Sequence, residues 1–242
     1  MKEILFLILK VLGFYLILAG VYCDQEKLEV DHFPLMLGNR WSYKYRVEET
    51  VIDSMADTSY TLNYEGQCLF RIDTLEIKEG WQCYRLKGEL YFNGDTLQAT
   101  LWLAHPDTAL LEIATLLGEW KPSLIESSIR KGAPSLPLLS DSGKTPKKLY
   151  IFPLSLGKRW RVSEEEEREV VDSAQTKVPA GDFSTFEIET ISERGGEHKI
   201  WLGKIGLVKE SSVDTLKIET DMGTSTHIKR WTYELEDYSI GE

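Results

Sequence analysis

Hydrophobic and polar residues alternate with a period of two along much of the chain. In Trp41–Val47 the odd positions are aromatic or aliphatic and the even positions are polar. Apolar and polar residues also alternate in Tyr60–Tyr64, Tyr84–Phe92 and Ile228–Leu235. Successive side chains of a strand point to opposite faces, so each segment predicts a β-strand with one apolar and one polar face.

Turn-forming residues separate these segments. The clearest are Asn93-Gly94-Asp95, Pro179-Ala180-Gly181-Asp182, Gly195-Gly196 and Asp221-Met222-Gly223. Short strands between such turns predict an all-β, mostly antiparallel fold, with little helix beyond the N-terminal segment. Leu110–Leu117 is ambiguous, because its apolar residues share a helical face, whereas comparison with Gly206–Lys209 favours a strand.

One motif occurs twice. Phe33–Trp41 reads FPLMLGNRW, and Phe152–Trp160 reads FPLSLGKRW 119 residues later. At the same offset Val51–Ser54 matches Val170–Ser173. Self-similarity at a fixed offset is typical of internal repeats. We therefore expect two tandem repeats, each a curved antiparallel sheet or open half-barrel.

The repeat suggests four regions. Residues 1–23 are a signal peptide or membrane anchor, 24–120 are β repeat 1, 121–150 are a linker and 151–242 are β repeat 2. The linker prediction rests on Pro122, Pro134, Pro137 and Pro146, because proline cannot donate to a sheet ladder.

The N-terminal segment is typical of export. Lys2 and Lys10 accompany the apolar run Ile4–Tyr22, and Cys23 precedes a polar stretch. Three outcomes fit: cleavage before Cys23 with lipidation of its thiol, ordinary signal-peptidase cleavage, and an uncleaved anchor. All three place the body outside the cytoplasm, in the periplasm, outer membrane or cell surface.

The formal net charge of −11 bears on partners. An acidic surface without a basic stripe disfavours binding to nucleic acid. Contact with a membrane is expected only through the N-terminal lipid or anchor.

The cysteines of the body predict free thiols. In a hairpin turning at Lys78-Glu79-Gly80, Leu75 faces Cys83 and Cys68 faces Leu90, on the other face of the sheet. The two Cα atoms would then lie roughly 23 Å apart at strand rise, whereas a disulfide needs them within about 7 Å. We therefore expect Cys68 and Cys83 to be unpaired.

Three stretches resemble known proteins. The Phe33 and Phe152 motifs, VPAGDF at Val178–Phe183 and WLGKIGLV at Trp201–Val208 resemble uncharacterised bacterial envelope proteins of the TapB-like or DUF3108-like kind. The segment Trp102–Leu111 is also similar to a hairpin of LolA/LolB-type lipoprotein carriers. That second resemblance implies an incomplete antiparallel barrel around an apolar cavity, and neither resemblance supplies a catalytic residue.

Candidate chemistry is sparse. His32, His105, His198 and His227 stand in no metal-ligand spacing, and no catalytic motif is present. We expect no metal and no cofactor. Trp102 and Trp201 are candidates for lining an apolar groove.

The acidic run Glu164–Glu167 marks a difference between the repeats. At the offset of 119 residues, Glu164 and Glu166 replace Tyr45 and Val47. Repeat 2 therefore loses the apolar stripe of repeat 1 here, which makes the two glutamates a candidate divergent acidic patch.

These observations favour a non-enzymatic extracytoplasmic binding or scaffold protein of the bacterial cell envelope, which holds an apolar molecule or a partner protein. Two alternatives stay open: a purely structural envelope module without a ligand, and an enzyme whose site is assembled between the two repeats.

Overall fold

The computed structural model describes residues 28–53, 57–92, 95–117, 146–192, 196–220 and 223–241. Within these ranges the chain forms twelve β-strands and no helix. The strands are β1 (Arg40–Asp53), β2 (Thr58–Lys78), β3 (Trp81–Phe92), β4 (Asp95–Ala104), β5 (Ala109–Leu117), β6 (Lys147–Ile151), β7 (Arg159–Arg161), β8 (Glu166–Val178), β9 (Gly181–Ser192), β10 (Glu197–Gly203), β11 (Gly206–Thr220) and β12 (Gly223–Ser239). The predicted all-β, antiparallel fold class is confirmed.

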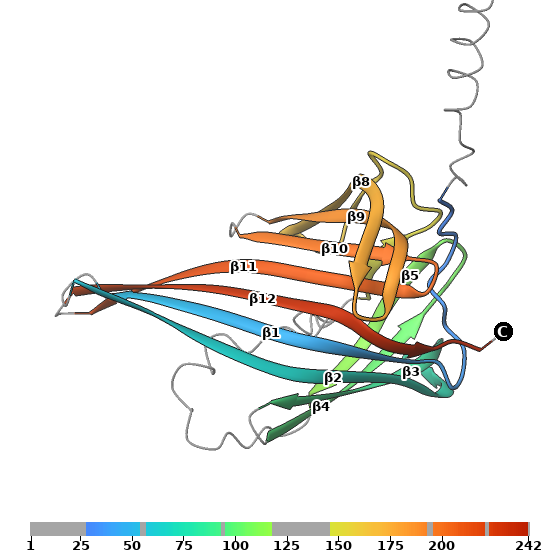
Figure 1. Ribbon diagram of the computed structural model, residues 1–242. Coiled ribbons are helices and arrows are strands. Elements are labelled where there is room, and N and C mark those ends of the chain that lie inside the picture. The colour runs from blue at the N-terminus through green and yellow to red at the C-terminus, as the bar shows by residue number, and fades with distance from the viewer. Residues whose placement is uncertain are drawn as a thin grey trace, which may run out of the picture.

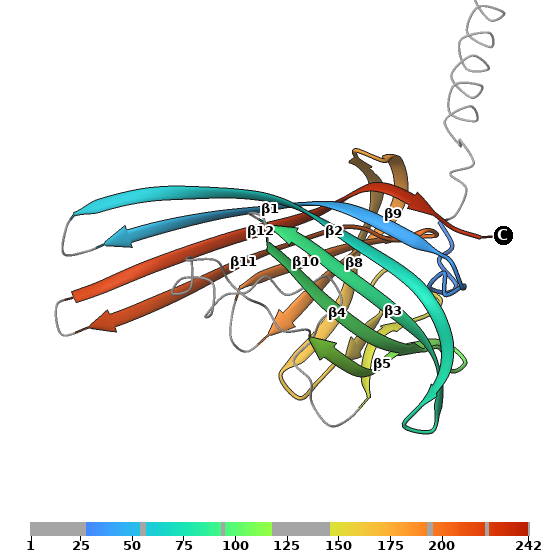
Figure 2. The same ribbon diagram turned by 90° about the horizontal axis from the view of Figure 1, so that it is seen from below.

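All twelve strands belong to one sheet, in the order β6-β5-β4-β3-β2-β1-β12-β11-β10-β9-β8-β7. Strands that follow one another in sequence are neighbours, except β6 and β7, which form the two outer strands of the sheet, and β12 returns to pair with β1. The sheet coils strongly, so that its two outer strands, β6 and β7, approach each other (Figures 1 and 2). The result is a nearly closed barrel in which both predicted repeats share one continuous sheet.

Side chains close the seam, which is the junction between β6 and β7. The Trp160 indole Nε1 donates to the Leu149 carbonyl at 3.0 Å, and the Arg168 guanidinium donates to the same carbonyl at 3.1 Å. The Arg168 guanidinium also lies 5.5 Å from the centre of the Tyr150 ring. Side-chain donors thus satisfy the carbonyl of Leu149, which in a fully closed barrel would accept a backbone hydrogen bond from the neighbouring strand.

Aromatic side chains fill the interior of the barrel. The predicted apolar stripe of β1 faces inward, and Trp41, Tyr43 and Tyr45 are at most 3% exposed. The Tyr45 and Tyr233 rings pack with centroids 4.7 Å apart. One continuous hydrophobic cluster runs from β1 through both halves of the chain, so the two halves bury a common core.

The two FPL motifs fold alike. Asn39 N donates to Met36 O, and Lys158 N donates to Ser155 O, each at 3.1 Å. Both motif glycines, Gly38 and Gly157, have positive φ in these turns, which favours glycine. The side chains of Asn39 and Lys158 donate to the carbonyls of Pro34 and Pro153 at 2.8 and 2.7 Å.

Beyond the motif, the residues that correspond between the two halves differ between the sequence repeat and the structure. Gly38 N donates to Ile72 O and Gly157 N donates to Val170 O, both at 2.8 Å. Val170 therefore occupies the place of Ile72, and not that of Val51 as the offset of 119 residues predicts. The reason is that β1 runs on without a break, whereas β7 ends after three residues and the chain turns back into β8.

Bulges occur at matching places in the two halves. The β2–β3 register shifts between Ile72 and Thr74, and the β8–β9 register shifts between Val170 and Asp172. Further shifts follow Trp102 in β4 and Trp201 in β10. Bulges increase the local twist of a sheet, which suits a sheet that coils into a barrel. The tandem repeat itself stays a prediction.

Two local predictions change. Leu110–Leu117 lies in the strand β5, so the helical alternative is wrong. Its neighbours β4 and β6 pair with its backbone, and that pairing overrides the helical spacing of the apolar residues. The predicted linker lies largely outside the described residues, but Lys147–Tyr150 at its end belongs to β6 and pairs with β5, because no proline interrupts this short segment.

The middle strands extend beyond the barrel. Neighbouring β3 pairs with β2 only from Gly66 onward, and β10 pairs with β11 only up to Val213. Beyond these points β11, β12, β1 and β2 are the only described strands, and they continue as a four-stranded sheet, to the left in Figure 1. We call this part of the sheet the extension.

Candidate binding groove

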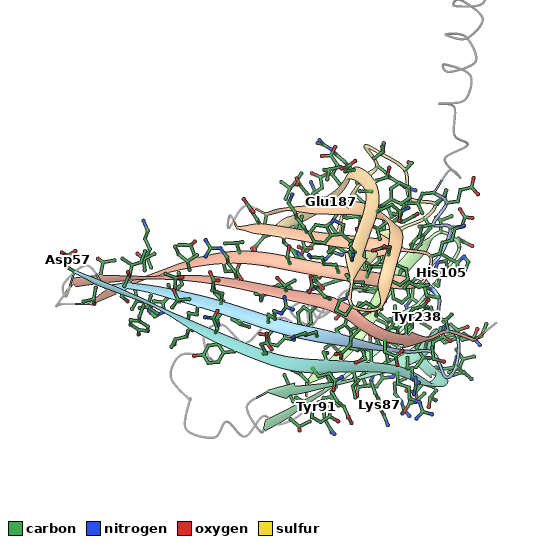
Figure 3. All side chains as sticks on the ribbon, in the orientation of Figure 1. Asp57, Lys87, Tyr91, His105, Glu187 and Tyr238 are labelled. Carbon is green, nitrogen blue, oxygen red and sulfur yellow. The ribbon has the colours of Figure 1, made fainter. Side chains whose placement is uncertain are left out.

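A groove of about 660 Å³ lies on the outer face of the sheet, across β12, β1, β2 and β3. It forms on the polar side of these strands, because Arg40 and Ser42 alternate with the buried Trp41 and Tyr43. Its polar lining consists of Arg40, Ser42, Gln67, Arg71, Asp73, Lys87, Glu89, Glu236 and Asp237. Figure 3 labels Lys87, one of these lining residues.

Gln67 links three strands on one side of the groove. Its side-chain amide donates to Ser42 Oγ at 3.1 Å and to Glu236 Oε2 at 2.9 Å. Arg40 lies 3.9 Å from Asp237, where both side chains are well exposed. Since exposed ion pairs contribute little to stability, this side of the groove can exchange its partners at small cost.

Asp73 is the best-paired carboxylate of the groove. It stands at the β2 bulge and accepts hydrogen bonds from Arg85 Nε and Lys87 Nζ, each at 2.9 Å. The hydrogen bond from Arg85, with help from Lys87, lowers the pKa of Asp73 to about 2. The carboxylate is therefore ionised at any physiological pH and holds the two basic side chains in place.

Asp73→Asn is expected to remove part of the acid sensitivity of folding. The folded pKa is depressed, so the stabilisation is present above the unfolded value near 3.9 and is lost as pH falls through about 2. At neutral pH the variant should lose on the order of 1–2 kcal/mol. In urea unfolding followed by circular dichroism, the difference should shrink as pH falls towards 2 and vanish only below that pH.

Asp237→Asn is the matched control, because that carboxylate is 69% exposed and only loosely paired. It should change stability little at any pH. A stability difference between wild type and Asp73→Asn that does not depend on pH would contradict the assignment.

Other groups of the groove face solvent. Leu69 is 36% exposed although its neighbours Cys68 and Phe70 are buried. Arg71 is exposed, and among the described residues no hydrogen bond or ion pair is found for its guanidinium. The groove thus combines an available cation, paired carboxylates and one exposed apolar side chain, beside the buried Trp41 and Phe70.

The structure does not bring Trp102 and Trp201 together. Each alternates with core aliphatic residues and so lies on the outer face of the sheet. In sheet order β4 and β10 are separated by β3, β2, β1, β12 and β11. The Trp102 Nε1 donates to Glu76 Oε1 at 2.6 Å, and Lys209 Nζ lies 5.5 Å from the Trp201 ring centre. These hydrogen-bond and cation–π partners account for the placement of both tryptophan rings on the outer face.

The candidate acidic patch lies at a turn. Glu164 stands between β7 and β8, and Glu166 begins β8. Val162 N and Ser163 N donate to Glu166 O at 2.9 and 3.2 Å, which closes the turn. Glu166 Oε1 accepts from Arg168 at 3.0 Å. The sequence difference from Tyr45 and Val47 therefore reflects a reversal of the chain, because a strand that turns here has no apolar face to continue.

The cysteine prediction is confirmed. Cys68 and Cys83 are free and buried, Cys68 in the main core and Cys83 in a small outer cluster with Ala104 and Ile113. Cys68 pairs with Leu90 as expected. Near the turn the predicted register is off by one, since Lys78 pairs with Trp81 over the two-residue turn Glu79-Gly80, and the bulge after Ile72 restores it. Burial raises the pKa of the Cys68 thiol.

Two histidines pair with buried carboxylates. The His198 Nε2 lies 2.7 Å from Glu210 Oε1, and the His227 Nδ1 lies 3.1 Å from Glu49 Oε1. Among the described residues no group of His, Cys, Asp and Glu side chains is arranged to hold a metal ion. The same ranges contain no helix long and apolar enough to cross a bilayer. Cys23 lies outside the described residues, so its lipidation stays a prediction.

Sequence reasoning missed the groove. Its residues are ordinary polar positions of the strands β12, β1, β2 and β3, and they lie far apart in the chain. The one local signal is Leu69, an apolar residue at a position where the alternation predicts a polar one. The groove exists because non-local pairing brings Glu236 and Gln67 next to β1.

Comparisons with known proteins do not assign the chain to a family. No protein-family model matches it, and no curated protein matches it. One solved structure, described as an exported protein with a YmcC-like fold, comes from Bacteroides fragilis. It aligns with 12% identity and a TM-score of 0.41, and the alignment covers 87% of this chain and 99% of the other. A protein assigned as a lipoprotein from Parabacteroides distasonis aligns with 11% identity and a TM-score of 0.29, at the same coverage. These TM-scores are too low to establish a shared fold.

Proposed function

We propose that the protein is a non-enzymatic binding module of the bacterial cell envelope that works outside the cytoplasm and binds a partner protein in the outer groove. The observation that carries this proposal is the contrast between a filled barrel interior and an open groove on its polar face.

The filled interior argues against a carrier of apolar molecules. Such a carrier needs a pocket of a few hundred Å³ lined by apolar groups. Here Tyr45, Tyr150 and Tyr233 are at most 1% exposed and occupy the space between the strands. Within the described residues the resemblance to LolA/LolB-type carriers therefore extends to an antiparallel, incomplete barrel, whereas buried tyrosines stand where it implies an apolar cavity.

The chemistry of the groove suits a polypeptide. Among the described residues Arg71 offers a cation without an internal partner, Glu89 and Asp237 offer carboxylates, and Leu69 offers an exposed apolar contact. A protein surface or an extended segment with an acidic side chain next to an apolar one complements this pattern. An apolar small molecule would leave the charges of the groove without solvent or partner.

The location outside the cytoplasm rests on the N-terminal sequence. A basic residue, a long apolar run and a cysteine followed by polar residues are typical of exported and lipid-modified envelope proteins. Mass spectrometry of the protein from its host tests this part. A diacylglycerol thioether on Cys23 would select the lipoprotein outcome, and a chain retained in the cytoplasm would contradict the proposal.

Site-specific photo-crosslinking in the host tests the groove. A photoreactive residue at position 69 is expected to capture one discrete partner protein, and Arg71→Glu in the same chain should reduce this capture at least about tenfold, the loss of one good charge contact. The matched control places the photoreactive residue at Val171, which is 39% exposed on β8 away from the groove.

Two results would contradict the proposal. Equal capture at positions 69 and 171 would leave no role for the groove and would favour a purely structural module. Lipid that co-purifies in stoichiometric amount in native mass spectrometry, together with no capture at position 69, would favour the carrier function.

A further inference from the structure

The outer edge of β2 is an open strand edge. Along Thr58–Glu65 the backbone pairs with β1 on one side, and no described strand pairs with it on the other, since β3 reaches only to Gly66. An unpaired edge presents N–H and C=O groups in a row that can accept another strand.

This edge lacks the usual protection. Native edges are blunted by lysine, by proline or by bulges. The segment TSYTLNYE contains neither lysine nor proline, its only charged residue is Glu65, and its pairing with β1 is free of register shifts. The opposite edge of the extension, on β11, carries Asp214 and Lys217. The two edges of one small sheet are therefore protected unequally.

Two of the three apolar side chains of this edge are exposed, and the third, Tyr64, is half-buried. Tyr60, Leu62 and Tyr64 share the face of Val47 and Val51, which are buried. Yet Tyr60 is 54% exposed and Leu62 is 37% exposed. The sequence predicts an apolar strand face here, and within the described residues nothing covers it at the edge.

We propose that a second copy of this chain adds its own β2 edge to this one, antiparallel and centred on Leu62. In that register Leu62 faces Leu62 of the second copy, Tyr60 faces Tyr64, and Thr61 faces Asn63. Opposite residues of an antiparallel pair share a face of the sheet, so the exposed apolar side chains meet across the interface. Glu65 faces Ser59, so no like charges are opposed.

The position of the edge favours self-pairing. Asp57, directly before β2, lies at the far tip of the extension, while Lys87 of the groove lies at the other end of the molecule (Figure 3). The extension therefore keeps the two acidic barrels apart, beyond the roughly 8 Å over which charge acts at physiological salt. A two-fold axis through Leu62 joins the two extensions into one sheet and closes the assembly as a dimer. The proposal does not depend on the groove.

Disulfide trapping in the full chain, in membranes of producing cells, tests the register. Leu62→Cys should form a disulfide-linked dimer upon mild oxidation, at least about tenfold more than Leu216→Cys. Leu216 is the matched control because it is 43% exposed on the same face at the opposite edge of the extension. The wild-type chain controls for its own cysteines.

A charge swap in the Leu62→Cys chain tests the pairing itself. Thr61→Lys with Asn63→Lys puts lysines directly opposite each other in the proposed register, and the dimer should fall to the level of Leu216→Cys. Thr61→Lys with Asn63→Glu opposes unlike charges, and the dimer should return. Circular dichroism of each variant checks that the fold is retained.

The proposal is overturned if Leu62→Cys yields no more dimer than Leu216→Cys. It is also overturned if both charge variants behave alike, or if Leu62→Cys becomes linked instead to a different polypeptide, which would make that polypeptide the occupant of the edge.

Discussion

Trp160→Ala is expected to lower the free energy of unfolding by about 3–5 kcal/mol, the range for removing a buried tryptophan. Trp160 is 4% exposed in the core, and its ring centroid lies 6.4 Å from that of Tyr150 on β6. The substitution leaves a cavity at the seam and removes one of the two hydrogen bonds to Leu149 O. The strand β7 has only three residues, so few other backbone hydrogen bonds hold it in the sheet.

Trp160→Phe separates packing from hydrogen bonding. It keeps most of the ring, and Arg168 still donates to Leu149 O at 3.1 Å, so the carbonyl is not left unpaired. The expected loss is about 1–2 kcal/mol. Urea unfolding followed by far-ultraviolet circular dichroism measures both variants.

Trp102→Ala is the control for tryptophan removal as such. Trp102 lies half-buried on the outer face and away from the seam, so its loss should destabilise clearly less than that of Trp160. If the two alanine variants unfolded at the same urea concentration, the seam would not have the importance that we assign to it.

Gly88→Ala is expected to destabilise the fold by about 1–3 kcal/mol, the usual cost of overpacking. A Cβ at this position on β3 would lie 2.6 Å from Cε1 of the Phe70 ring. Phe70 is 3% exposed and cannot simply move away, because its ring packs edge-on against Tyr43 with centroids 6.0 Å apart. Tyr43 in turn donates to Leu207 O at 3.0 Å.

A double-mutant cycle with Phe70→Leu checks the cause. If the clash with the ring is responsible, Gly88→Ala should cost less in the Phe70→Leu chain than in the wild type, by about 1 kcal/mol. Strictly additive free energies of unfolding would show that Gly88 is needed for another reason. Urea unfolding by circular dichroism of the four chains provides the measurement.

The local sequence predicted correctly which face of a strand each residue lies on. The alternation in Trp41–Val47 assigned the buried face of β1, and all four apolar residues are at most 5% exposed. The same reasoning placed Cys68 and Cys83 on opposite faces and left both thiols free. The face of a strand residue follows from its parity alone.

The pattern along the chain did not predict burial or groove formation where these depend on strands that are distant in sequence. Tyr60 and Leu62 form an apolar strand face by sequence, but β3 ends too early to cover them. Residue type alone makes Trp102 and Trp201 candidates for an apolar groove, whereas their alternation with core aliphatic residues places them on the outer face. The groove that does exist depends on Glu236, Arg40, Leu69 and Lys87 meeting across four strands.

The residue pattern was therefore enough to predict the alternating strand segments and the inward face of β1, because these depend on backbone geometry and on neighbours a few residues away. Contacts between distant segments decide that β12 closes on β1, that β7 turns back at Glu164, and that no described strand pairs with the outer edge of β2 before Gly66. The physical reason is that the backbone N–H and C=O groups of a strand accept any partner strand. The choice is made by chain length, bulges and packing across more than a hundred residues.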